Sequence, residues 1–186
     1  MVRQGAGVGH PIAAPAISRR RAAVDRLRVR GGADAVIDLT AYWKGRDTQY
    51  AEELTDEIIF NAGVTVSKAN DWLSLAGRSD ITSVNSGWRP QSVNDATSNA
   101  AKGSKHLLAL AVDLPDPDGL LAEWMMDNVG SLKECGLWAE HPGATVGWVH
   151  LQTVPPGNPP RPQVRVFLPN SNPLKTKRFG TTPIIV

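Results

Sequence analysis

The spacing of apolar residues changes along this chain, and that change most limits the folds it can adopt. Helical spacing predicts two amphipathic helices, one starting at Tyr50 and ending at Gly63, and one over Val66–Ala76. Short strand-like runs dominate after residue 107. The expected strands are Ile81–Ser86, a strand carrying Asp113, Gly136–Glu140, Trp148–Val154 and Val164–Leu168, and a third helix covers Leu120–Val129. Helices first and strands later predict a single α+β domain with a small antiparallel sheet flanked by helices.

The charge balance argues against a nucleic-acid-binding body. The 186 residues include 20 Lys and Arg and 18 Asp and Glu, but seven arginines and only two aspartates lie in residues 1–34. The remainder holds 13 basic and 16 acidic residues, a net charge of about −3. We therefore expect residues 1–34 to be a disordered basic leader, and any contact with nucleic acid or another anionic polymer to involve that leader.

Several classes of protein are disfavoured by what the sequence lacks. A single cysteine, Cys135, excludes an internal disulfide and a multi-cysteine metal site. No apolar run approaches the roughly 20 residues of a membrane-spanning helix. The leader has no apolar segment typical of a secretory signal. We expect a soluble protein without a signal peptide or membrane span, with a loose polar tail at 170–186.

Four histidines limit the choice of metal ligands. A hydrolytic zinc site needs three protein ligands and a free position for water. His10 lies in the leader, whereas His106, His141 and His150 lie in the structured part of the chain. Asp113 ends an apolar run, where a carboxylate is costly unless it is paired or bound to a metal. Each of these residues alone is also typical of an ordinary core, surface or turn position.

His106 and Asp113 can share one metal only if the chain bends between them. Seven extended residues would separate them by roughly 23 Å. We therefore expect Asp113 on a strand, His106 on the approach to it, and His150 on a second strand between apolar neighbours. The spacing differs from the His-x-Asp of non-haem iron sites, which disfavours that class.

Short motifs follow one another in a fixed order along residues 42–152. They are Tyr-Trp-Lys-Gly-Arg-Asp at 42–47, Ser-Gly-Trp-Arg at 86–89, the run Ser104–Asp113, Gly-Leu-Trp-Ala-Glu at 136–140 and Gly-Trp-Val-His-Leu-Gln at 147–152. Together they resemble the D-alanyl-D-alanine carboxypeptidase-like zinc peptidases, whose pattern is Ser-x-His-x-x-Gly-x-Ala-x-Asp. That family includes short phage endolysins and is related in fold to the hedgehog signalling domain. The resemblance spans about residues 39–169 and implies a zinc peptidase domain at 35–169.

The resemblance implies a role for each matching residue. It implies zinc bound by His106, Asp113 and His150. Arg89 would hold a substrate carboxylate or polarise the scissile carbonyl, which suits its planar, always-charged guanidinium. Ser104 would help to position the substrate. A surface arginine beside a turn and a loop hydroxyl or helix cap are the ordinary alternatives for Arg89 and Ser104.

The sequence departs from the family pattern at two positions. Ala109 stands where the family has glycine, so we expect the turn between the first two ligands to do without a positive φ. Gly147 stands where many members have a glutamate that acts as general base. Glu140 is then the first candidate for the base and His141 the second, because imidazole can also accept the proton.

These features predict a zinc metallopeptidase that hydrolyses a peptide bond in peptidoglycan stem or cross-link peptides. Both an endolysin-like endopeptidase and a D,D-carboxypeptidase fit the motifs. Such an enzyme would be made in the cytoplasm of an infected or producing bacterium and act on the cell wall after release. The alternative is a non-catalytic zinc-containing module of the same fold that binds the cell wall or associates with a virion.

Overall fold

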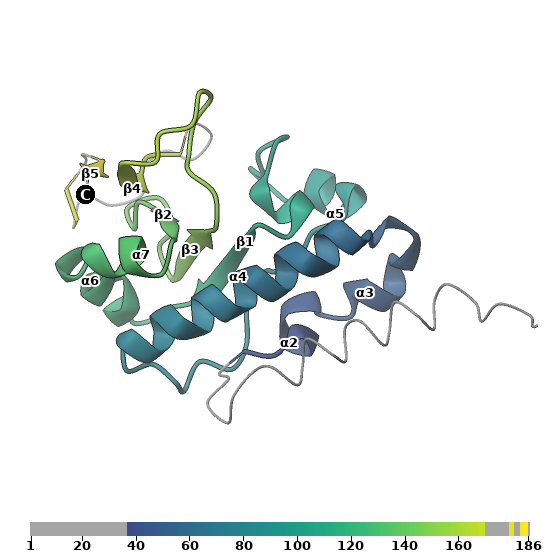
Figure 1. Cartoon of the computed structure of the whole chain (residues 1–186), viewed down its shortest axis with the longest axis horizontal. Coiled ribbons are helices and arrows are strands. Elements are labelled where there is room, and N and C mark those ends of the chain that lie inside the picture. Colours follow the sequence, from purple (N-terminus) through teal and green to yellow (C-terminus); the bar gives the residue numbers. More distant parts are fainter. Residues whose placement is uncertain (1–36, 170–178, 181–182, 186) are drawn as a thin grey trace, which may run out of the picture.

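We describe a computed structural model of the chain, which covers residues 37–169, 179–180 and 183–185 (Figure 1). The expected leader at 1–34 and most of the expected tail lie outside these residues. The helices are α2 Leu39–Trp43, α3 Arg46–Gln49, α4 Asp56–Leu75, α5 Gln91–Ala96, α6 Leu120–Asp127 and α7 Gly130–Glu134, with 3₁₀ turns η1 Ala51–Glu53 and η2 Lys105–Leu108. The strands are β1 Ala111–Pro115, β2 Trp138–Glu140, β3 Trp148–Gln152, β4 Val164–Phe167 and β5 Ile184–Ile185.

The strands form one sheet in the order β1-β3-β2-β4-β5. The pairs β1/β3, β3/β2 and β4/β5 are antiparallel, whereas β2 and β4 run parallel. Helices flank this sheet in Figure 1. The predicted α+β class with a small, mainly antiparallel sheet is confirmed. One strand, β5, lies within the segment that was expected to be a loose tail.

The predicted break at Gly63 is wrong, because α4 is one continuous helix of 20 residues. Thr55 begins it, with its side chain accepting a hydrogen bond from the Ile58 amide at 3.2 Å. A glycine inside a helix costs about 1 kcal/mol relative to alanine. The helix packs against α2 and β1 through a buried apolar face, which outweighs that cost. Within the described residues, no helix is long and apolar enough to cross a membrane.

The predicted strand at Ile81–Ser86 is also wrong, apart from one bridge. The Asp113 amide donates to the Ser86 carbonyl at 2.8 Å, and the Asn85 amide donates to the Asp113 carbonyl at 2.8 Å. In this antiparallel register Val84 would face Pro115, which has no amide hydrogen, and the Val84 carbonyl accepts a hydrogen bond from Lys44 Nζ at 3.0 Å. A side chain therefore takes the place of further ladder hydrogen bonds. The bridge nevertheless fixes the backbone of Asp113 on the outer side of β1.

The main buried core lies on one face of the sheet, a smaller apolar cluster of Trp138, Val164 and Phe167 is separate from it, and the second face of β1 and β3 is left for polar groups. Strand side chains alternate between faces. The apolar positions of β1 and β3 that belong to the buried core are Val112, Leu114, Val149 and Leu151. Trp43 and Trp88 add an edge-to-face contact at 5.9 Å that joins α2 to the turn before α5.

Candidate metal centre

Asp113 and His150 lie directly opposite each other on β1 and β3. Residues opposite each other in an antiparallel pair place their side chains on the same face. Their neighbours on both strands point into the core, so these two polar side chains project from the other face. The alternation that buries the strands thus brings two of the predicted ligands together.

His106 reaches the same place because the chain bends between η2 and β1. Ser104 caps η2, accepting a hydrogen bond from the His106 amide at 3.3 Å. Ala109 then turns the chain with φ 55° and ψ 27°, a left-handed conformation. This corrects the expectation that the turn does without a positive φ. The conformation costs alanine roughly 1–2 kcal/mol, and the Thr65 hydroxyl holds it by donating to the Ala109 carbonyl at 2.8 Å.

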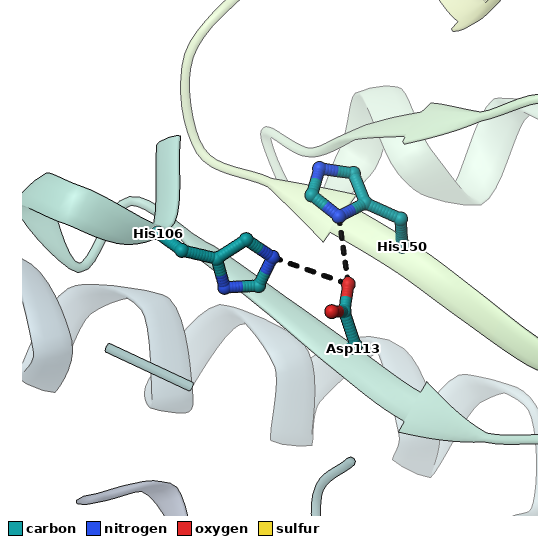
Figure 2. A group of neighbouring side chains, drawn as sticks. All are labelled: His106, Asp113 and His150. Carbon is teal, nitrogen blue, oxygen red and sulfur yellow. Dashed lines mark hydrogen bonds and ion pairs between the residues drawn. The ribbon is translucent and has the colours of Figure 1, made fainter. Parts of the chain in front are cut away.

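The three side chains converge on one carboxylate oxygen (Figure 2). His106 Nε2 lies 3.2 Å from Asp113 Oδ1, and His150 Nδ1 lies 2.8 Å from the same atom. Their ligand atoms all lie within 4.8 Å of one another. The exposed fractions are 1% for His106, 8% for Asp113 and 6% for His150. This buried group could hold a metal ion.

The hydrogen bonding of His106 favours a cation between the ligands. His106 Nδ1 lies 2.7 Å from the Gly87 carbonyl, which can only accept, so Nδ1 carries the proton. Burial lowers the pKa of His106 and favours the neutral ring, whose Nε2 then has a lone pair. That lone pair faces Asp113 Oδ1. A metal ion satisfies both atoms, and an outer hydrogen bond from the ligating histidine to a carbonyl is typical of metal sites.

The pKa values of Asp113 and His150 depend on burial and on the charges around them. Burial opposes ionisation of Asp113, but His106 and His150 lower its pKa well below the usual value, so it is a carboxylate. Burial opposes charge on His150, but Glu140 and Asp113 together raise its pKa. A cation held between these side chains would therefore face the Asp113 carboxylate.

A cavity of about 370 Å³ opens over the three ligands. Its volume is within the usual range for small-molecule sites. Arg89, Glu140 and Trp148 line it together with the ligands. A metal held by His106, Asp113 and His150 would therefore be accessible to a ligand in this cavity.

The structure brings Glu140 to this cavity and leaves His141 outside its lining. Glu140 is the last residue of β2, and its neighbour Ala139 pairs with the core residue Leu151. By alternation Glu140 lies on the polar face. Burial raises the pKa of Glu140, against the lowering effect of His150. His141 Nδ1 instead accepts a hydrogen bond from the Gly143 amide at 3.1 Å.

Arg89 is a buried cation at the cavity wall, with an exposed fraction of 9%. Its amide donates to the His106 carbonyl at 3.0 Å, and its Nη2 donates to Ser104 Oγ at 3.4 Å. Its Nε is buried without a hydrogen-bond partner among the described residues. Burial lowers the pKa of Arg89, while the charges of Asp113 and Glu140 raise it. Arg89 and Ser104 thus lie beside the ligands as a linked pair.

Gly147, which replaces the family's glutamate, does not line the cavity. Its φ of 88° is a conformation in which glycine is favoured. Its carbonyl accepts a hydrogen bond from the Asp116 amide at 3.0 Å, which fixes the turn before β3. A base at this position would strain that turn, whereas Glu140 reaches the cavity from the neighbouring strand.

Sequence reasoning missed Gly87 and Gln152 as supports of the ligands. The Gly87 carbonyl orients His106, and the Gln152 side chain hydrogen-bonds His150. Gly87 lies inside the Ser-Gly-Trp-Arg motif and Gln152 inside Gly-Trp-Val-His-Leu-Gln, so both motifs carried the signal. From these two motifs, the sequence predicts only Arg89 and His150 as residues of the site.

We expect Gly87→Ala to weaken both the fold and the metal site. A Cβ at Gly87 would overlap the Tyr42 backbone carbonyl. Overpacking of this kind costs about 1–3 kcal/mol of unfolding free energy. Displacement of the Gly87 carbonyl from His106 should lower metal affinity about 10–100-fold. Gly103→Ala is the matched control, because a Cβ there meets no atom within 4 Å. Denaturant unfolding and metal titration measure both effects; wild-type metal affinity in Gly87→Ala would contradict the role given to this carbonyl.

The donor set has a defined chemistry. Two imidazole nitrogens and one carboxylate oxygen, with room for a further ligand in the cavity, suit a Lewis-acidic metal that activates water. No family model, curated protein or solved structure matches this chain. The case for its function therefore comes from this geometry and from the motif resemblance.

Proposed function

We propose that this chain is a zinc-dependent peptidase that hydrolyses a peptide bond in peptidoglycan stem or cross-link peptides. The observation that carries the proposal is the shared cavity, which places Glu140 and Arg89 beside the His106, Asp113 and His150 group. The ordered motifs from residue 42 to residue 152 support the same class. The enzyme would meet the cell wall after release from the bacterium that produces it.

Zinc is the metal that this donor set favours. Zinc is bound by imidazole nitrogen and carboxylate oxygen in four-coordinate sites, and catalytic sites use three protein ligands and a water. Calcium and magnesium prefer oxygen ligands, which two histidines do not provide. When bound, zinc would lower the pKa of a water molecule towards neutrality and polarise the substrate carbonyl.

Glu140 is the residue proposed to move the proton. Its carboxylate would accept a proton from the attacking water and deliver it to the leaving amine. Burial raises its pKa above the ordinary value, which makes it a stronger base than an exposed glutamate. His141 is not proposed for this step, since its ring is directed to the Gly143 amide.

Arg89 and Ser104 are proposed to bind and orient the substrate. A buried guanidinium that forms no ion pair among the described residues attracts a carboxylate or a polarised carbonyl oxygen. Ser104 Oγ lies next to the Arg89 guanidinium and to the His106 amide, so it links substrate binding to the first ligand. Both residues line the cavity.

The experiment that tests this function is lysis of purified peptidoglycan by the zinc-loaded chain. We expect lysis, its loss after chelation, and its recovery when zinc is added back. Deleting residues 1–34 should leave lysis unchanged, since the described domain contains every residue assigned to the reaction. Stoichiometric zinc binding without any lysis would refute the peptidase proposal.

Gly147 favours a second candidate, a non-catalytic zinc-containing module that binds the cell wall or associates with a virion. In that case binding to insoluble peptidoglycan would persist without release of new amino groups. Cosedimentation with the cell wall, measured together with amine release, separates the two candidates.

A further inference from the structure

A second cavity of about 330 Å³ lies beside the metal site. It shares Arg89 and Asp113 with the first cavity and adds Arg46 and Ser86 to its lining. Arg46 comes from α3 and Ser86 from the segment that bridges β1, so elements far apart in sequence meet here. Neither Arg46 nor Ser86 has a part in the proposed reaction.

One hydrogen bond to the Trp88 carbonyl holds the guanidinium of Arg46. Its Nη1 donates to the Trp88 carbonyl at 2.7 Å, next to Arg89 in the chain. A guanidinium carries five N–H donors in a planar fork. The Trp88 carbonyl occupies one of its nitrogens, so the remaining donors of Arg46 are available to a ligand in the second cavity.

Within the described part of the chain, neither guanidinium group in this cavity, that of Arg46 or that of Arg89, forms an ion pair. Their positive charges repel each other, and the charge of Arg46 contributes to lowering the pKa of Arg89. Asp113 is the acid in the cavity lining, and its carboxylate is engaged by both histidines. Two guanidinium groups therefore line one cavity with a single carboxylate that the histidines already engage.

Unpartnered polar atoms in this lining also indicate a missing ligand. Ser86 Oγ and Arg89 Nε are buried and have no hydrogen-bond partner within the described part of the chain. Buried polar atoms in folded proteins nearly always have a partner. A ligand that accepts several hydrogen bonds and carries negative charge would satisfy both atoms and both arginines.

We propose that Arg46, Arg89 and Ser86 form a carboxylate-binding subsite beside the metal. The occupant is a free carboxylate of the peptide substrate, so this inference rests on the proposed function for its source of ligand. Arginine forks match the two oxygens of a carboxylate, and the Ser86 hydroxyl supplies a further donor. The subsite would select peptides that carry a free carboxylate close to the bond held at the metal.

The test uses the zinc-loaded full chain and two probes of nearly equal size, N-acetylglycine and N-acetylglycinamide. Titrations followed by NMR should show that the acid binds at least about tenfold more tightly than the amide. Arg46→Gln should weaken binding of the acid by about tenfold and leave the zinc content unchanged. Arg161→Gln is the matched control, because Arg161 lines the first cavity and not the second.

Three results would overturn the subsite: equal binding of acid and amide, unchanged acid binding in Arg46→Gln, or inorganic phosphate binding as tightly as the acid. Ser86→Ala serves if Arg46→Gln fails to fold, and it should weaken acid binding severalfold. Failure of the peptidase proposal would show separately, as absent lysis while the acid still binds more tightly than the amide.

Discussion

Glu140→Gln is expected to lower kcat for peptidoglycan hydrolysis by about 10²–10⁴-fold, the usual contribution of a general base. Glutamine keeps the size of the side chain and removes its ability to accept the proton from water. Zinc is proposed to bind to His106, Asp113 and His150, and not to Glu140, so the variant should keep its zinc. The KM should change little, because Arg89 and Ser104 are the residues assigned to binding.

Steady-state amine release and zinc content, measured on the same preparation, test this prediction. Glu134→Gln is the control, since Glu134 is an exposed acid at the end of α7 and does not line the cavity. A kcat for Glu140→Gln within threefold of wild type would remove Glu140 from the mechanism. Loss of zinc along with activity would instead make Glu140 part of the metal site.

Asp113→Asn is expected to release the metal. Both histidines contact the same Asp113 oxygen, and the substitution removes the negative charge that lies between them. We expect metal affinity to fall by more than the 10–100-fold that is typical when only an outer hydrogen-bonding partner is lost. The metal-free protein should also lose roughly 3–5 kcal/mol of unfolding free energy, as when one partner of a buried ion pair is removed.

Asp116→Asn provides the matched control for this loss. Asp116 is also a buried aspartate, but its oxygens accept hydrogen bonds from the Leu121 and Ala122 amides at the start of α6. Its substitution should lower stability and spare metal affinity. Equal metal affinity in Asp113→Asn and Asp116→Asn would contradict the ligand role of Asp113.

The placement of Asp113 and His150 on strands could be predicted from the sequence, because side chains alternate between the two faces of a strand with a period of two residues. Apolar neighbours on both sides of His150 and an apolar run before Asp113 leave one face for these polar residues. The bend that brings in His106 follows from the reach of an extended chain. The means of bending could not be predicted, because alanine rarely adopts a left-handed conformation and Thr65, far from it in sequence, supports it.

The remaining differences also arise from tertiary contacts. Gly63 is a helix-breaking signal on its own, but packing on α2 and β1 keeps α4 continuous. The sequence 81–86 resembles a strand, yet the partner position on β1 is Pro115, which has no amide hydrogen, and Lys44 Nζ occupies the Val84 carbonyl. Arg46 and Arg89 line the second cavity together because segments far apart in the sequence pack against each other. No local sequence pattern predicts that they lie in the same cavity.

The most direct test of the central claim is the metal-to-protein ratio of the purified wild type and of His106→Ala, Asp113→Ala and His150→Ala. Each substitution removes one side chain of the grouped ligands. The account predicts about one zinc per wild-type chain and less than about one tenth of that in each variant, as expected when one of three protein ligands is lost. If all three variants retain metal as the wild type does, the claim that these residues form the metal centre is wrong.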